Sequence, residues 1–144
     1  MTLEIHRDLL DEIHRHGEQA YPEEAAGMLL GKVEADRKIV LQRLELHNAR
    51  EDSARHNRYL LTASDYLNAE QAAANLKVDV VGVYHSHPDH PNRPSDFDRE
   101  WAMPWFSYLI TSVQAGQAQG SRSWQLAEDR SAFHEETIIL VHKK

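Results

Sequence analysis

The chain of 144 residues carries 16 basic and 23 acidic side chains, a formal net charge of −7, and no cysteine. The missing cysteine excludes a disulfide scaffold, a cysteine nucleophile and a thiolate-bound zinc, and the acidic balance argues against a nucleic-acid-binding protein. A hydrophobic fraction of 41% fits a globular chain, and residues 1–144 fit one domain of ordinary size.

The first predicted element is a helix over residues 7–20. Leu9, Leu10 and Ile13 fall on one helical face, with charged residues elsewhere. Pro22 prevents the helix from continuing. The residues before this helix lack the basic and apolar runs of a signal peptide, so none is predicted.

Two strands and a loop are predicted next. The apolar run 25–31 predicts a short buried strand, and the alternating segment 38–46 predicts a half-buried strand. The polar stretch 45–58 is expected to form a loop, with a further short strand at 59–61.

A second helix is predicted over residues 64–76, where Ser64 can cap the first turn. The apolar residues near one face are expected to point to the core: Leu67, Ala72, Ala73 and Leu76. The β-branched run 79–84 that follows is typical of a central strand buried on both faces.

The C-terminal part begins with a Pro-rich loop, 88–94, and a short helix from Ser95 that ends before Pro104. Three late strands are predicted, at 106–113, 122–126 and 136–142. Helices and strands are therefore mixed, which predicts an α/β or α+β domain with a central mixed β-sheet flanked by helices. No apolar run is long enough to cross a bilayer, so a cytoplasmic location without membrane contact is expected by default.

The chemistry-bearing motif is His85-x-His87 at the end of the central strand. Alternate residues of a strand share a face, so both imidazoles can point to one ion. A catalytic zinc also needs a third protein ligand and a position left open for water. Asp98 can supply that ligand because the Pro-stiffened loop can fold the chain back. A further carboxylate must accept the water's proton, and Glu23 and Glu24 are the candidates.

Each part of this motif also has a simpler interpretation. In a chain with 10 histidines, a His-x-His pair is expected about once by chance. Ser95 and Asp98 have the spacing of a helix capping box, and Glu24 beside Glu23, taken alone, is better explained as a solvated surface acid. Only the combination of all the parts favours a metal site.

Other histidines and aromatic residues have simpler interpretations. His90 is assigned to the loop surface, because its spacing fits neither strand geometry nor the motif. Trp101, Trp105 and Phe106 are expected to pack in the core or at its rim rather than to bind substrate. No partner spacing supports a metal role for the remaining histidines, His6, His14, His16, His47, His56, His134 and His142.

In combination, these segments resemble the JAMM (MPN+) zinc metalloproteases. The family pattern is Glu-x-x-Gly, a later His-[Ser/Thr]-His-Pro, and then Ser-x-x-Asp. Here the parts are Glu24–Gly27, His85–Pro88 and Ser95–Asp98, and the seven residues between His87 and Ser95 match the family spacing. Flanking segments look like the small single-domain bacterial branch. Ala26 occupies a position where family members often have Cys. The residue at this position does not take part in the family's catalysis.

The resemblance implies a cytidine-deaminase-like JAB/MPN domain with one Zn²⁺ per chain. His85, His87 and Asp98 match the family's zinc ligands. Glu24 matches its general acid/base, and Ser95 matches the residue that helps to stabilise the oxyanion. The implied activity is that of a peptidase or isopeptidase, acting at the C-terminal Gly-Gly tail of a ubiquitin-like or sulfur-carrier protein.

Two other function classes are compared with the residues, and one of them stays open. A non-catalytic MPN-type binding scaffold is the alternative, although inactive relatives of that kind have lost metal ligands that this chain retains. A zinc deaminase of the His-x-Glu and Pro-Cys-x-x-Cys type is excluded, because the chain has no cysteine. The sequence does not predict the oligomeric state.

Overall fold

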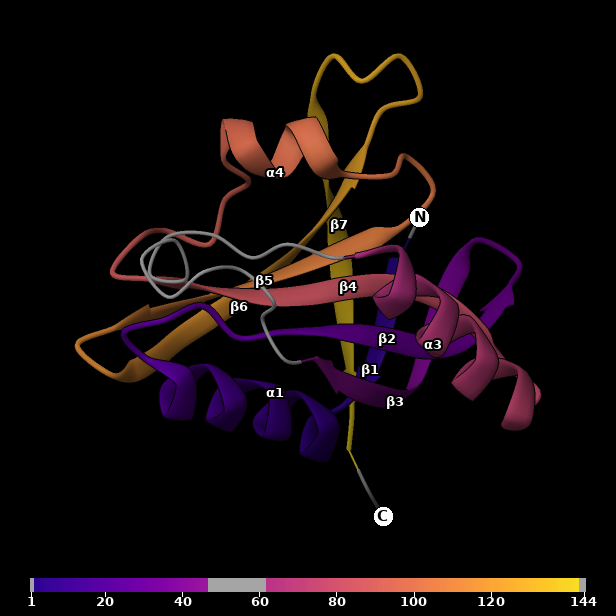
Figure 1. Cartoon of the computed structure of the whole chain (residues 1–144), viewed down its shortest axis with the longest axis horizontal. Helices are drawn as coiled ribbons and strands as arrows, with labels where there is room; N and C mark the ends of the chain where they lie inside the picture. Colours follow the sequence, from indigo (N-terminus) through magenta and orange to yellow (C-terminus); the bar gives the residue numbers. More distant parts are fainter. Residues whose placement is uncertain (1, 47–61, 143–144) are drawn as a thin grey trace.

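Seven β-strands and three helices are found in residues 2–46 and 62–142, the part of the chain that the computed structural model describes (Figure 1). The strands are β1 (Thr2–His6), β2 (Ala26–Glu34), β3 (Arg37–Leu46), β4 (Asp79–Pro88), β5 (Ser107–Gln114), β6 (Gln117–Leu126) and β7 (Phe133–Val141). The helices are α1 (Arg7–Ala20), α3 (Ala63–Asn75) and α4 (Asp96–Trp101). The predicted α+β architecture, a mixed sheet with helices around it, is confirmed.

The sheet closes on itself in the order β1-β3-β2-β4-β5-β6-β7. β1 closes it by pairing in parallel with both β3 and β7. β4 and β5 also pair in parallel, and the other neighbours are antiparallel. The closing strand, β1, was not predicted from the sequence. The strand predicted at 59–61, and the loop predicted at 45–58 from residue 47 onward, lie outside the described residues.

Helix α1 has the predicted bounds and packs on the sheet through Leu10, Ile13 and Gly17. Gly17 allows a close approach, because a Cβ there would lie 3.3 Å from the Cβ of Ser86 on β4. Helix α4 is the short helix predicted after Ser95. No described helix is long and apolar enough to span a membrane.

The start of α3 and of β6 differs from the prediction. Thr62, not Ser64, caps α3, and it forms a capping box with Asp65. β6 begins at Gln117, ahead of the predicted 122, because the strand continues to the tight turn that joins it to β5. Hydrogen bonds set both ends, in the capping box for α3 and across the sheet for β6, and local apolar periodicity does not reveal them.

The buried face of α3 was also predicted wrongly in part. Ala69 and Ala73 are buried, whereas Leu67 and Leu76 are 65% and 49% exposed. The small alanines let the helix backbone lie close to the sheet, and the face they define turns the two leucines toward solvent.

The hydrophobic core lies on both sides of β4. Val80 and Val83 pack in the cluster that includes the α3 alanines. Val81 and Tyr84 pack in the cluster that includes the apolar residues of α1. The predicted burial of this strand on both faces is confirmed, and the strand carries the motif histidines at its C-terminal end.

Candidate metal centre

Strand pairing brings the two distant parts of the motif together. β2 and β4 are antiparallel, and Ala26 pairs with His85. The main-chain N–H of Ser86 donates to the carbonyl of Ala25 at 3.0 Å, and the N–H of Ala25 donates to the Ser86 hydroxyl at 2.8 Å. Glu24, immediately before Ala25, is therefore fixed beside the histidine end of β4.

The two imidazoles lie side by side at the end of β4. His85 and His87 are both buried, and their ring centroids are 5.0 Å apart. The Nδ1 atom of His87 lies 2.8 Å from the carbonyl oxygen of Pro91, so an N–H at Nδ1 can donate to it. That bond orients the ring and leaves Nε2 as the atom with an available lone pair, the arrangement usual for a metal-binding histidine.

Asp98 joins the histidines from α4. Its Oδ1 lies 3.6 Å from Nε2 of His85, and its Oδ2 lies 3.2 Å from Nε2 of His87. Burial by itself opposes ionisation, but the two imidazoles outweigh it and lower the pKa of Asp98 to about 2. The side chain is therefore a carboxylate at neutral pH, the form that binds a cation.

Ser95 holds Asp98 in place. The main-chain N–H of Ser95 donates to Oδ2 of Asp98 at 2.8 Å, and the N–H of Asp98 donates to the Ser95 hydroxyl at 3.1 Å. This is the capping box that the spacing suggested. The helix cap and the delivery of Asp98 to the histidines are thus one structural feature.

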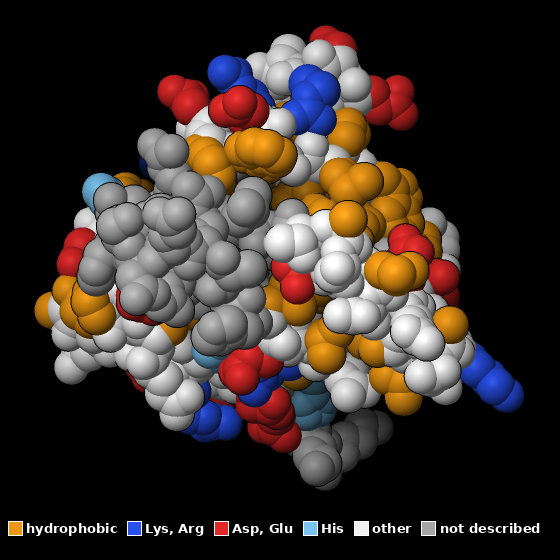
Figure 2. Space-filling model, in the orientation of Figure 1, with side chains coloured by type: hydrophobic (Ala, Val, Ile, Leu, Met, Phe, Trp, Pro, Cys, Tyr) orange, Lys and Arg blue, Asp and Glu red, His pale blue; other side chains and the backbone are white. Residues whose placement is uncertain are grey.

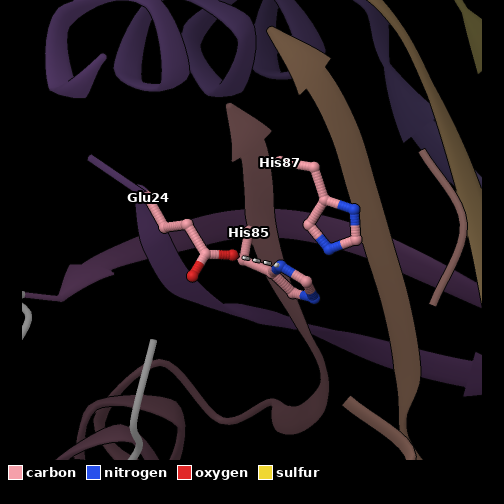
Figure 3. Close-up of side chains that lie close together, drawn as sticks. All are labelled: Glu24, His85 and His87. Atoms are coloured by element: carbon pink, nitrogen blue, oxygen red, sulfur yellow. Dashed lines mark ion pairs between the residues drawn. The ribbon is translucent and has the colours of Figure 1, made fainter. Parts of the chain in front are cut away.

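Glu24 reaches the same histidines from the β2 side, as Figure 3 shows. Its Oε1 lies 3.7 Å from Nδ1 of His85. Its Oε2 is buried and has no hydrogen-bond partner among residues 2–46 and 62–142. Glu24, His85 and His87 each offer an atom within 4.8 Å of the others. Buried imidazoles with a carboxylate oxygen that lacks a partner are a donor set that fits a divalent cation.

A cavity of about 430 Å³ opens beside this cluster. Its lining includes Glu24, His87 and Ser95, together with Arg93 and Phe97. Part of the site, Glu24, His87 and Ser95, therefore borders this cavity, whereas His85 and Asp98 are not among its lining residues.

His90 is exposed, as predicted, and its side chain is not part of the metal group, but it borders the cavity. Two other histidines have partners that sequence spacing did not reveal. His14 lies 2.8 Å from the Ser121 hydroxyl, and His16 lies 2.8 Å from the Tyr84 hydroxyl. These contacts join α1 to the sheet, and no local pattern in the sequence could have identified them.

One contact at the site was missed by the sequence reasoning. The Tyr21 hydroxyl donates to Oδ2 of Asp89 at 2.6 Å, and Oδ1 of Asp89 accepts from the N–H of Ala115 at 2.9 Å. This bond ties the segment before Glu24 to the loop after His87. In the sequence, the one indication of this contact is that Tyr21 and Asp89 both lie in segments next to the motif residues.

Comparison with known proteins gives matches over most of the chain. The family described as prokaryotic homologs of the JAB domain matches residues 6–127. A protein of Thermus thermophilus named as a probable TtuB-protein conjugate cleaving protease is 27% identical over 118 residues, which cover 80% of this chain and 75% of that protein.

Solved structures share the fold. A protein of Desulfitobacterium hafniense has a TM-score of 0.86 and 28% identity, covering 99% of this chain and 94% of that one. A protein of Salinibacter ruber has a TM-score of 0.75 and 47% identity, covering 96% and 91%. A JAB1/MPN domain protein of Archaeoglobus fulgidus has a TM-score of 0.60 at 18% identity, covers 97% of each chain, and supports the fold alone.

Proposed function

We propose that this chain, which belongs to the prokaryotic JAB/MPN domain family, is a zinc-dependent peptidase or isopeptidase that hydrolyses an amide bond. One observation carries the proposal: two buried carboxylates and two buried imidazoles converge from three elements beside an open cavity. Buried charges usually have partners within the protein. Here the group has the composition of a metal site, and two of its members, Glu24 and His87, line the cavity.

His85, His87 and Asp98 are proposed to hold one Zn²⁺ per chain. The support is that the Asp98 carboxylate faces Nε2 of both histidines, at 3.6 and 3.2 Å. Two imidazoles and one carboxylate leave one zinc position free for water. When bound, zinc would polarise the scissile carbonyl and lower the pKa of its water to about 7.

Glu24 is proposed as the general acid/base. Glu24 faces Nδ1 of His85, whereas Asp98 faces Nε2 of the same ring. The two carboxylates therefore approach different atoms of His85. The buried Oε2 of Glu24, without a partner among the described residues, can accept a proton from water and return it to the leaving amine. Glu24 is chosen over Glu23, the other candidate in the sequence, because its Oε1 lies 3.7 Å from Nδ1 of His85.

Ser95 is proposed to stabilise the oxyanion. Its oxygen already accepts the N–H of Asp98, and a hydroxyl keeps its own proton to donate. Because Ser95 also lines the cavity, that proton can be offered to negative charge developing on the substrate carbonyl.

The substrate is proposed to be the C-terminal Gly-Gly tail of a ubiquitin-like or sulfur-carrier protein. The Thermus relative supports the class of reaction, since its name describes cleavage of protein conjugates. A tail of this kind is thin and extended, which suits a cavity of about 430 Å³.

The test combines zinc analysis with a cleavage assay, on protein purified without a metal-affinity tag. The substrates are ubiquitin-like sulfur-carrier proteins with C-terminal extensions, and mass spectrometry locates the cut. We expect about one zinc per chain and a cut after Gly-Gly. Glu24→Gln should lose about 10²–10⁴-fold in kcat with zinc retained, and Glu23→Gln is the matched control. Near-normal turnover in Glu24→Gln would refute its role, and absence of both zinc and turnover would favour the scaffold alternative.

A further inference from the structure

An apolar surface lies at the end of α4 that points away from the metal centre. It consists of Trp101, Met103 and Trp105, which are 55%, 47% and 47% exposed. Figure 2 shows hydrophobic side chains gathered on this face, between α4 and α3. The sequence predicts that the tryptophans pack in the core or at its rim, but about half of the surface of each is exposed to solvent. Clustered large apolar side chains on a surface mark contact sites for other molecules.

The backbone beneath this α4 apolar surface is firmly held. The Arg130 guanidinium donates to three carbonyls at the end of α4, at 2.7 to 2.9 Å. The N–H of Met103 donates to the Tyr108 hydroxyl at 2.7 Å, and the buried ammonium of Lys38 donates to the carbonyl of Trp105. These bonds fix the main chain while the apolar side chains point outward. A preorganised surface loses little conformational entropy when a partner binds.

The α4 apolar surface is continuous with the catalytic cavity. Phe97, on the first turns of α4, lines the cavity, and its ring centroid lies 6.2 Å from that of Trp101. The two residues are one helical turn apart, a rise of about 6 Å. An extended tail of about five residues spans roughly 16 Å. A protein whose tail occupies the cavity would therefore bring its folded part over this surface.

The charges around the surface restrict the partner. A groove of about 650 Å³ lies between Met103 and Trp105 on one side and α3 on the other, and its charged lining residues are Glu70 and Asp79. Of the arginines beside α4, Arg130 donates to main-chain carbonyls and Arg99 lies 3.9 Å from the Asp96 carboxylate. The surface therefore suits an apolar patch with a basic rim. A second copy of this chain would place acidic groups against acidic groups, which costs binding energy.

From these observations we infer that the α4 apolar surface is the docking site for the folded body of the protein substrate, through an apolar patch with a basic rim. This inference rests on the proposed function, because it assumes that the tail of the same protein is cleaved in the cavity. Binding at Trp101 and Met103 increases affinity for the substrate and does not take part in the bond cleavage.

The experiment compares two substrates that share one scissile bond. The first is a ubiquitin-like sulfur-carrier protein extended beyond its Gly-Gly by a fluorogenic reporter. The second is a peptide with the last residues of that protein and the same reporter. The test variant is Trp101→Ser/Met103→Ser. Trp105 is left intact because its ring lies over the Lys38 ammonium, 4.9 Å from it. Leu41→Ser is the matched control, since Leu41 is 52% exposed on β3.

We expect the test variant to raise KM for the protein substrate about tenfold with kcat unchanged, because exposed Trp residues dominate such contacts. Peptide cleavage should stay within about twofold of the wild type, and Leu41→Ser should change neither. Light scattering of wild type and variant should give the same mass.

Three results would overturn the inference while leaving the proposed function standing. These are an unchanged KM for the protein substrate, an equal loss on protein and peptide, and a variant that differs from the wild type in oligomeric mass. The second would assign the residues to the shape of the cavity, and the third to self-association. A wild type that cleaves neither substrate would instead refute the proposed function, and the inference with it.

Discussion

Residues 2–46 and 62–142 bury two clusters of charged side chains, and the two clusters balance their charge differently. At the metal centre, Glu24 and Asp98 face His85 and His87. Neither carboxylate has a hydrogen bond or ion pair with a lysine or arginine in the described part of the chain. The second cluster lies elsewhere in the sheet and contains a positively charged side chain, Lys38, which is 0% exposed.

In the second cluster a cation and an anion both come from within the chain, although Oε2 of Glu136, like that of Glu24, is buried without a hydrogen-bond partner among the described residues. The Lys38 ammonium donates to the Ser107 hydroxyl at 3.0 Å, and Glu136 accepts from the Ser123 hydroxyl at 2.8 Å. The Glu136 charge raises the pKa of Lys38 against the larger effect of burial. A lysine and a glutamate therefore offset each other, whereas the metal centre has an excess of carboxylate that an external cation would balance. The comparison teaches that burial of charge alone does not mark a functional site.

The largest expected effect is the loss of the carboxylate charge at the metal centre. Asp98→Asn keeps the capping-box shape but removes the ionised ligand. We expect turnover to fall by about 10³-fold or more, since a catalytic metal contributes several kcal/mol. Zinc affinity, measured by competition with a chromophoric chelator, should fall in parallel. Asp96→Asn is the matched control for zinc affinity, because its side chain on the same helix is fully exposed. Unchanged zinc affinity in Asp98→Asn would contradict the ligand assignment.

The next effect tests the internally balanced cluster. Lys38→Met leaves Glu136 buried without its cation. We expect the free energy of unfolding to fall by about 3–5 kcal/mol, because the Trp105 carbonyl and the Ser107 hydroxyl lose their donor, at about 1–3 kcal/mol for each buried group, and Glu136 loses the charge that acts on it. Lys38→Met/Glu136→Gln should recover part of that loss. Urea denaturation measures both, and a double variant no more stable than the single one would show that the charges do not compensate each other.

A smaller effect is the pH dependence of stability that Lys38 confers. Burial lowers its pKa to about 8 from 10.5, and Glu136 opposes the shift. Between these values the folded chain has lost the proton and the unfolded chain still holds it. The free energy of unfolding should therefore rise with pH from about 8 toward 10, by less than about 3 kcal/mol. The slope of the free energy of unfolding against pH is measured in the wild type and in Lys38→Met/Glu136→Gln. Equal slopes in the two proteins would exclude a contribution from Lys38.

The sequence predicted the secondary structure best where local periodicity was strong. The helix over 7–20 has its predicted bounds. Strand β1 was missed because only Leu3 and Ile5 mark its buried face, and its hydrogen bonds go to strands far along the chain. The same closure of the sheet buries Lys38, which a half-buried alternating strand would have placed in water.

The candidate site was predictable in composition but not in geometry. Spacing and the family resemblance selected Glu24, the two histidines and Asp98, and the structure brings all four together. Their contacts depend on the pairing of Ala26 with His85, which no local pattern encodes. The α4 apolar surface was not predicted as a contact site, because Trp101 and Trp105 have the composition of core residues and only their solvent exposure shows otherwise.

The smallest expected effect concerns Ser86, which lies between the motif histidines. Its hydroxyl accepts a hydrogen bond from Ala25, the residue after Glu24. Ser86→Ala removes the hydroxyl that accepts the N–H of Ala25, and should cost about 1–2 kcal/mol of stability. Because the displaced residue is Glu24 and not a zinc ligand, kcat should fall about tenfold while zinc affinity stays constant. Ser86→Thr, which keeps the hydroxyl, is the matched control. Parallel loss of zinc in Ser86→Ala would mean that the serine also supports the metal ligands, and the separate roles proposed for Glu24 and Asp98 would then need revision.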